Sequence, residues 1–64
     1  MVEVYDIIQV DGYDDEWDGC LMFVDEVCDG YILAGMYVPY KGVTFLRLED
    51  GEYYVVAKEG VWQS

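Results

Sequence analysis

The chain is divided into short runs of β-branched and aromatic residues, each ended by glycine or aspartate. Such runs are typical of β-strands, and no segment keeps the 3.6-residue apolar period of an amphipathic helix over three turns. Asp29-Gly30 has the sequence of a tight hairpin turn. The runs predict an all-β domain with a first strand within 4–10, further strands at 20–27, 31–38, 43–48 and 53–57, and turns at 39–42 and 49–52.

The length sets the size of the core. Sixty-four residues make one domain, 1–64, with its core within 5–57 and a short C-terminal tail at 58–64. A chain this short buries only about 60% of its unfolded surface, so large side chains must fill the core. The seven Tyr, two Trp and two Phe fit that need. The residues expected in or near the core include Tyr31, Leu33, Tyr37, Phe45, Leu46, Leu48, Val55 and Val56.

Apolar residues lie on both faces of the second and third predicted strands. A flat antiparallel sheet of two layers would keep one face polar. The pattern therefore favours a strongly bent sheet that closes on itself. Gly35, in the middle of the third strand, is the expected bend point.

The order of these pieces, with a long acidic and aromatic loop after the first strand, resembles the SH3-like barrel superfold from about Tyr5 to Ala57. The glycine before the second strand resembles the KOW-type variant. The pattern WDGCLMFVDEV…GYILAGMYVP…GVTFLRLEDGEYYVV is similar to small SH3-like proteins encoded in bacteriophages. The resemblance implies a five-stranded SH3-like barrel. It does not imply polyproline binding, because the Ala-Leu-Tyr-Asp-Tyr signature and paired tryptophans of eukaryotic SH3 modules are missing from the sequence, and a fold alone does not supply a function.

The charge of the chain is strongly one-sided, with 14 acidic residues against three Lys and Arg and a net charge of −11. Direct contact with nucleic acid or with an anionic membrane needs clustered cations, so neither is expected. A partner should instead carry positive charge. The alternative is that acidity only keeps a small protein soluble and monomeric. With no signal peptide and no apolar run of about 20 residues, the expected location is the cytoplasm.

Catalysis and metal binding are not expected. The chain has no His, and two Cys alone cannot complete a structural zinc site. Cys20 and Cys28 lie at the two ends of one predicted strand, roughly 26 Å apart, so they are expected to be free thiols. Neighbouring acids disfavour the reactive thiolate. The run 11–18 fails the calcium-loop pattern at its third and sixth positions, Tyr13 and Glu16, so no metal or other cofactor is predicted and a solvated loop is favoured.

The candidate site is therefore a protein-binding surface. In an SH3-like barrel the loops after the first two strands lie side by side, so their acids are expected to converge at one end. Exposed aromatic residues are enriched at interfaces, although Trp17 is as readily explained as a lid on the core. The candidate partner-binding residues are Asp11, Tyr13, Asp14, Asp15, Glu16, Trp17, Asp18, Asp25, Glu26, Asp29 and Tyr40.

Two functions remain open from the sequence. The first is a non-enzymatic acidic binding module, in its sharper form a nucleic-acid mimic that inhibits a basic host nuclease or DNA-binding protein, as anti-CRISPR and anti-restriction proteins do. The second is a structural or assembly accessory of a phage or mobile element that docks through Tyr13, Trp17 and Tyr40. A monomer or a weak homodimer is expected in either case.

Overall fold

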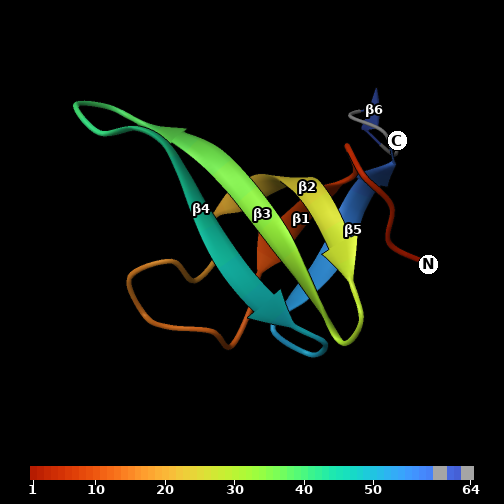
Figure 1. The fold of residues 1–64 in the computed structure, drawn as a ribbon. Helices are drawn as coiled ribbons and strands as arrows, with labels where there is room; N and C mark the ends of the chain where they lie inside the picture. Colours follow the sequence, from red (N-terminus) through yellow and green to blue (C-terminus); the bar gives the residue numbers. More distant parts are fainter. Residues whose placement is uncertain (59–60, 63–64) are drawn as a thin grey trace.

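The computed structural model describes residues 1–58 and 61–62. Its strands are β1 (Ile7–Val10), β2 (Leu21–Cys28), β3 (Tyr31–Val38), β4 (Gly42–Glu49), β5 (Tyr53–Lys58) and β6 (Val61–Trp62). They form one antiparallel sheet of order β4-β3-β2-β1-β5-β6 (Figure 1). No described residue is helical.

The predicted all-β fold class is confirmed, and β3 has the predicted bounds. The first strand lies within its predicted range, since β1 begins at Ile7 and Val4 and Tyr5 before it form a turn. The short β6 was not predicted. Residues 59–60 and 63–64 of the expected tail lie outside the described residues.

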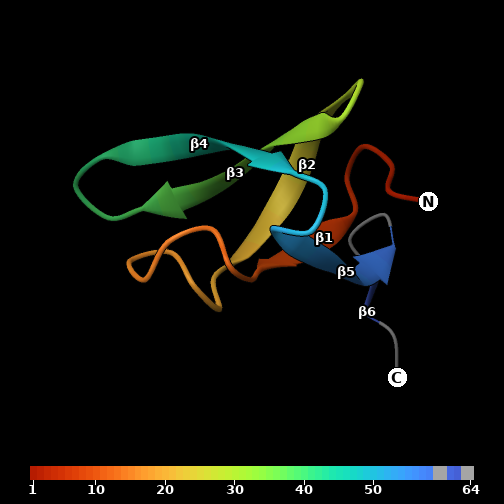
Figure 2. The same cartoon turned by 90° about the horizontal axis from the view of Figure 1, so that it is seen from below.

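The sheet bends at β2, which belongs to both of its halves. The beginning of β2 pairs with β1, and from Phe23 onward β2 pairs with β3. The β2–β3 register shifts between Val24 and Glu26, so Asp25 is a bulge residue, and bulges bend a strand and increase its twist. Figure 2 shows the result, with β3 and β4 in one layer, β1 and β5 in another, and β2 crossing between them.

This bend encloses the core without a closed ladder, since among the described residues no pairing joins β4 to β5 or β6. The core consists of alternating residues from both layers, each at most 2% exposed: Ile8, Val10, Met22, Val24, Ile32, Ala34 and Leu48. Burial of these side chains from both layers supplies the main driving force for the fold.

Part of the prediction for the core was wrong. Leu48 is buried and Leu46 packs against the core, but Tyr37, Phe45 and Val55 are 68%, 52% and 36% exposed. Successive side chains of a strand point to opposite faces. Tyr37 and Phe45 therefore lie on the outer face, because the residues next to them in sequence are the ones that turn toward the core.

Gly35 has a packing role that the sequence did not indicate. It lies between Phe23 on β2 and Phe45 on β4 in the register of the sheet. A Cβ atom on Gly35 would lie 2.8 Å from the Phe45 ring and 2.9 Å from Phe23 Cζ. The two rings meet edge to face above it, with centroids 6.4 Å apart and an interplanar angle of 85°. Gly35 thus makes room for an aromatic pair, whereas the bulge at Asp25 is the irregularity at the bend.

We expect Gly35→Ala to lower the free energy of unfolding by about 1–3 kcal/mol, the usual cost of overpacking a well-filled site. The added methyl group must push the Phe45 ring aside. Urea unfolding of G35A, F45A and G35A/F45A measures the coupling between the two positions. The G35A penalty should be smaller in the F45A background, and an equal penalty in both backgrounds would contradict this explanation.

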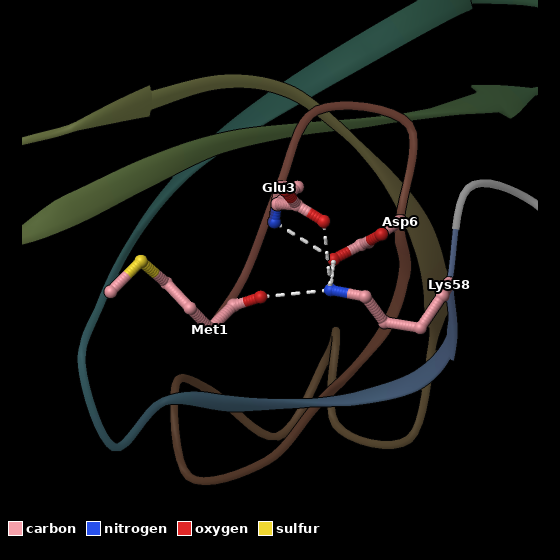
Figure 3. Close-up of polar contacts among 4 residues, drawn as sticks. All are labelled: Met1, Glu3, Asp6 and Lys58. Atoms are coloured by element: carbon pink, nitrogen blue, oxygen red, sulfur yellow. Dashed lines mark hydrogen bonds and ion pairs between the residues drawn. The ribbon is translucent and has the colours of Figure 1, made fainter.

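Asp6 is the one buried charged residue among those described, with an exposure of 0%. Its Oδ2 accepts hydrogen bonds from the Glu3 backbone N–H at 2.8 Å and from Lys58 Nζ at 2.7 Å (Figure 3). Lys58 also donates to the Met1 carbonyl at 2.8 Å and lies 3.4 Å from Glu3 Oε1. The Asp6 carbonyl accepts from Val24 N–H at 2.9 Å. Asp6 therefore ties the N-terminal segment to β2 and to the end of β5.

Replacement of Asp6 by Ala should lower the free energy of unfolding by about 1.5–3 kcal/mol, the range for a hydrogen bond to a charged group. The Glu3 N–H would lose its acceptor, and the Lys58 ammonium group would lose the carboxylate that it binds at 2.7 Å. Denaturant titration followed by tryptophan fluorescence measures the loss. Glu3→Gln is the matched control, because it removes an exposed carboxylate from the same ammonium group, and it should change stability far less. Equal losses in the two variants would refute the assigned role of Asp6.

Stability should fall at alkaline pH. The pKa of Lys58 is raised above its usual 10.5, chiefly by the hydrogen bond to Asp6 and further by the charges of Asp6 and Glu3, against an opposing effect of desolvation. A raised pKa means that the folded state holds the proton more tightly. The stability from this group is therefore complete below the unfolded pKa and is lost as pH rises through the folded one.

The measurement is the free energy of unfolding from pH 9 to about 12, compared between the wild type and Lys58→Arg. Arg stays protonated over this range, so the loss above pH 10.5 should be shallower in K58R. Parallel curves would show that Lys58 is not the responsible group.

Candidate interaction surface

The segment 11–19, here called the acidic loop, connects β1 to β2 and is organised by its own carboxylates. Asp14 Oδ1 accepts a hydrogen bond from Glu16 N–H at 2.6 Å, and Asp18 Oδ1 accepts one from Gly12 N–H at 3.2 Å. Such local side-chain bonds are typical of Asp in turns. All five acidic side chains of the loop are exposed: Asp11, Asp14, Asp15, Glu16 and Asp18.

A second acidic segment, the β4–β5 turn at 49–52, lies beside the acidic loop. Asp11 N–H donates to the Glu52 carbonyl at 2.9 Å, and Figure 2 shows both segments on the side of the molecule that faces the viewer. Within the turn, Glu52 Oε1 accepts from Glu49 N–H at 2.8 Å. Glu49 and Asp50 are exposed and Glu52 is half-buried. We call the acidic residues of the loop and of this turn together the acidic face.

The acidic residues of this turn, Glu49, Asp50 and Glu52, were not among the predicted partner-binding residues, although they lie close together in the sequence. The turn reaches the acidic loop because β5 pairs with β1, with Tyr53 opposite Val10. That pairing joins residues more than forty positions apart. No local pattern specifies it.

The convergence of acids from the loops after the first two strands stays a prediction. Asp29 is in the β2–β3 turn, two residues before Tyr31, which pairs with Glu49. The β2–β3 turn, the β4–β5 turn and the acidic loop all lie in the lower part of Figure 1. Asp25 and Glu26 are exposed on β2 itself, where Val24 binds the Tyr5 backbone. Asp25 is the bulge residue of β2, and Glu26 follows it opposite Leu33 of β3.

The three loop aromatics differ in their environment. Trp17 is half-buried and packs against the core cluster, so it covers the core. Tyr13 remains 37% exposed on the acidic loop. Tyr40 is fully exposed, in the turn between β3 and β4, and has a φ of 72°. Its turn closes with a hydrogen bond from Lys41 N–H to the Val38 carbonyl at 3.0 Å. This φ is the left-handed conformation that usually requires glycine.

A second candidate surface was not predicted. On the outer side of β2, β3 and β4, Phe45 lies opposite Gly35 and Tyr37 lies opposite Val43. These side chains, together with the neighbouring Phe23, form the aromatic outer face. Phe45, Tyr37 and Val43 are 52%, 68% and 53% exposed. The sequence contains this face as the residues that alternate with the core residues along the strands. Tyr37 and Phe45 were instead predicted to lie in or near the core.

The few cations lie away from the acidic loop. Lys58 is bound to Asp6, and Arg47 stacks 4.0 Å above the Tyr31 ring and lies 4.0 Å from Glu49. Among the described residues no ion pair reaches the acidic loop. The negative charge of its carboxylates is therefore not neutralised by an ion pair within this part of the chain. That charge favours the binding of cations and hydrogen-bond donors such as Lys and Arg.

The negative charge of the acidic face also contributes to a raised pKa at a neighbouring tyrosine. The pKa of Tyr53 is raised, first by burial and then by the charge and hydrogen bonding of Asp50. The pKa of Tyr31 is raised as well, chiefly by its hydrogen bond with Cys28. Both phenols are therefore neutral at physiological pH and can act as hydrogen-bond donors.

Metal-binding clusters, membrane-spanning helices and similarity to known proteins give no further indication of function. Within residues 1–58 and 61–62, no group of three or more Cys, Asp or Glu side chains is arranged to hold a metal ion. The same residues contain no helix that could cross a membrane. Comparison with protein-family models, with curated proteins and with solved structures found no match.

Proposed function

We propose that this chain is a non-enzymatic binding module that docks its acidic face on a basic protein surface. The observation that carries the proposal is the contact between the acidic loop and the β4–β5 turn, with Asp11 N–H 2.9 Å from the Glu52 carbonyl. It joins two acidic segments that are distant in the chain. A chain that needed charge only for solubility could spread it over the surface, where mutual repulsion would be smaller.

The acidic face has two properties that suit binding. Its density of exposed carboxylates attracts a basic partner from a distance and speeds association. Its backbone is also held in place by Asp14, Asp18 and Glu52, whose side chains accept backbone hydrogen bonds. A preorganised loop loses less conformational entropy when it binds.

The sharper form of the proposal is that the acidic face imitates nucleic acid. Carboxylates spaced over a rigid surface can replace backbone phosphates in the basic groove of a nuclease or of a DNA-binding protein. The resemblance to small phage SH3-like proteins supports such a host target, as in anti-CRISPR and anti-restriction inhibitors. The module would then act in the cytoplasm, where these targets lie.

A second candidate function is supported by the aromatic outer face. An assembly accessory of a phage or mobile element would dock through apolar contacts, for which Phe45, Tyr37 and Tyr40 are more exposed than Trp17. Apolar docking changes little with added salt, whereas docking of the acidic face weakens as salt screens the charges. Salt therefore separates the two functions.

The test is capture of bacterial lysate proteins on the immobilised chain, followed by elution with a salt gradient and, separately, with duplex DNA. We expect a basic partner that elutes with salt and is displaced by DNA. Reversal of Asp15 and Glu16 to Lys should weaken that partner's binding at least about tenfold. Neither side chain accepts a hydrogen bond that organises the loop, so the fold should be kept.

Asp25→Lys with Glu26→Lys is the matched control, because it reverses the same number of exposed charges on β2. A similar loss of binding in the control would show that net charge, rather than the acidic face, directs binding. A salt-elutable partner that DNA does not displace would exclude nucleic-acid mimicry and keep the basic partner. A salt-resistant partner unaffected by D15K/E16K would overturn the proposal in favour of the assembly role.

A further inference from the structure

β4 has an open side, since its one sheet partner among the described residues is β3. The two strands pair over eight consecutive positions without a bulge. Edge strands are usually protected by proline, bulges or central charges, because their free backbone groups pair readily with another strand. Residues 43–46 of this edge contain none of these, and Val43 and Phe45 are about half exposed. The open side of β4 is therefore a surface on which another strand can pair.

The sheet determines which backbone groups of β4 face this open side. The N–H and the carbonyl of Val24 both bond to the segment before β1, at 2.9 and 2.8 Å. Backbone groups alternate in direction along a strand, so Phe23 directs its own toward β3, where it lies opposite Gly35. Gly35 therefore bonds to β2 rather than to β4. Phe45, opposite Gly35 on β4, then directs its N–H and carbonyl away from β3.

The end of β4 leads to the same direction independently. Glu52 Oε1 accepts a hydrogen bond from Glu49 N–H at 2.8 Å, and Glu52 N–H donates to the Glu49 carbonyl at 3.0 Å. Glu52 thus takes the place of a pairing strand at the last residue of the edge. By alternation, Val43, Phe45 and Arg47 direct their backbone groups to the same side. Over residues 1–58 and 61–62, no hydrogen bond outside the sheet uses these groups.

Charge indicates what kind of strand can pair there. The open edge leads directly into the acidic face, because Glu49 ends β4 and Asp11 N–H binds the Glu52 carbonyl. A second copy of a chain with net charge −11 is repelled. A segment that carries Lys or Arg at the Glu49 end of the edge is attracted instead. Beside Val43 and Phe45, apolar side chains of the added strand can make cross-strand contacts.

We propose that an extended, basic segment of the partner protein pairs with β4 along residues 43–47 and directs its Lys or Arg side chains toward the acidic face. This inference rests on the proposed function and specifies how the basic partner is held. Backbone hydrogen bonds supply affinity in such strand addition, and the alternating side chains supply selectivity. Arg47 does not block the approach, because its guanidinium lies 4.0 Å above the ring of Tyr31 on β3.

The test uses a fluorescent synthetic peptide, Thr-Val-Thr-Val-Thr-Lys-Lys-Lys, titrated with the full chain and followed by anisotropy. We expect a Kd below about 1 mM that rises as salt is added. The same peptide with N-methylated Thr and Val amides keeps its charge but cannot donate to the edge. Its Kd should therefore be at least about tenfold higher.

Charge reversal in the protein tests the basic end of the peptide. Asp15→Lys with Glu16→Lys should raise the Kd of the unmodified peptide about fivefold or more. Asp25→Lys with Glu26→Lys is the matched control and should raise it far less, because these residues lie outside the acidic face and the β4 edge. Circular dichroism checks that both variants fold.

Amide hydrogen exchange at saturating peptide locates the added strand. Exchange at Val43, Phe45 and Arg47 should slow at least about tenfold, because their N–H groups gain acceptors. The N–H groups of Thr44 and Leu46 already bond to β3, so their exchange should slow far less. Equal slowing at all five amides, or slowing confined to other strands, would overturn the pairing.

Failure of this inference and failure of the proposed function give different results. A Kd that rises in D15K/E16K but not on N-methylation would overturn the strand pairing and leave the docking of the acidic face. A Kd that rises on N-methylation but not in D15K/E16K would overturn the role of the acidic face and leave the pairing. Absence of binding up to about 1 mM would overturn the pairing. Slowing of the same amides by rising protein concentration without peptide would also overturn it, because a second copy would then occupy the edge.

Discussion

The structure depends on the constraint that one small core must be covered from two sides by a single sheet. β2 meets this constraint because it pairs with β1 at its beginning and with β3 along the rest of its length. Phe23 takes part in both pairings, and the bulge at Asp25 follows it within the β2–β3 pair and lets the strand change direction. The core residues of both layers can then exclude water together, which neither half of the sheet could achieve alone.

The bend has consequences for the surface as well as for the core. It brings β5 beside β1, and this pairing carries the β4–β5 turn to the acidic loop. Asp6 and Lys58 secure the same region from the opposite end of β5, through the 2.7 Å bond between a buried carboxylate and an ammonium group. A pair of this kind stabilises one arrangement of the N-terminal segment, because Asp6 has no access to water as a substitute partner.

Two surfaces of opposite character result. The acidic face gathers negative charge and would bind a basic surface, with an affinity that falls as salt is added. The aromatic outer face is apolar instead, and its residues Tyr37, Val43 and Phe45 are each at least half exposed. Salt weakens docking through the acidic face and changes apolar docking little, so salt distinguishes the two surfaces in the same protein.

The sequence by itself determined the strands, since each depends on a local alternation of side chains and on the turn residues beside it, and the bounds of β3 were predicted from these alone. It also determined the net charge of −11, which predicts a basic partner. Only the tertiary structure decided which acids meet. The pairing of Val10 with Tyr53 joins segments distant in the chain, and long-range register is set by shared burial in the core. The outward position of Phe45 was decided in the same way, because alternation gives two faces and only the packed sheet selects the one that faces water.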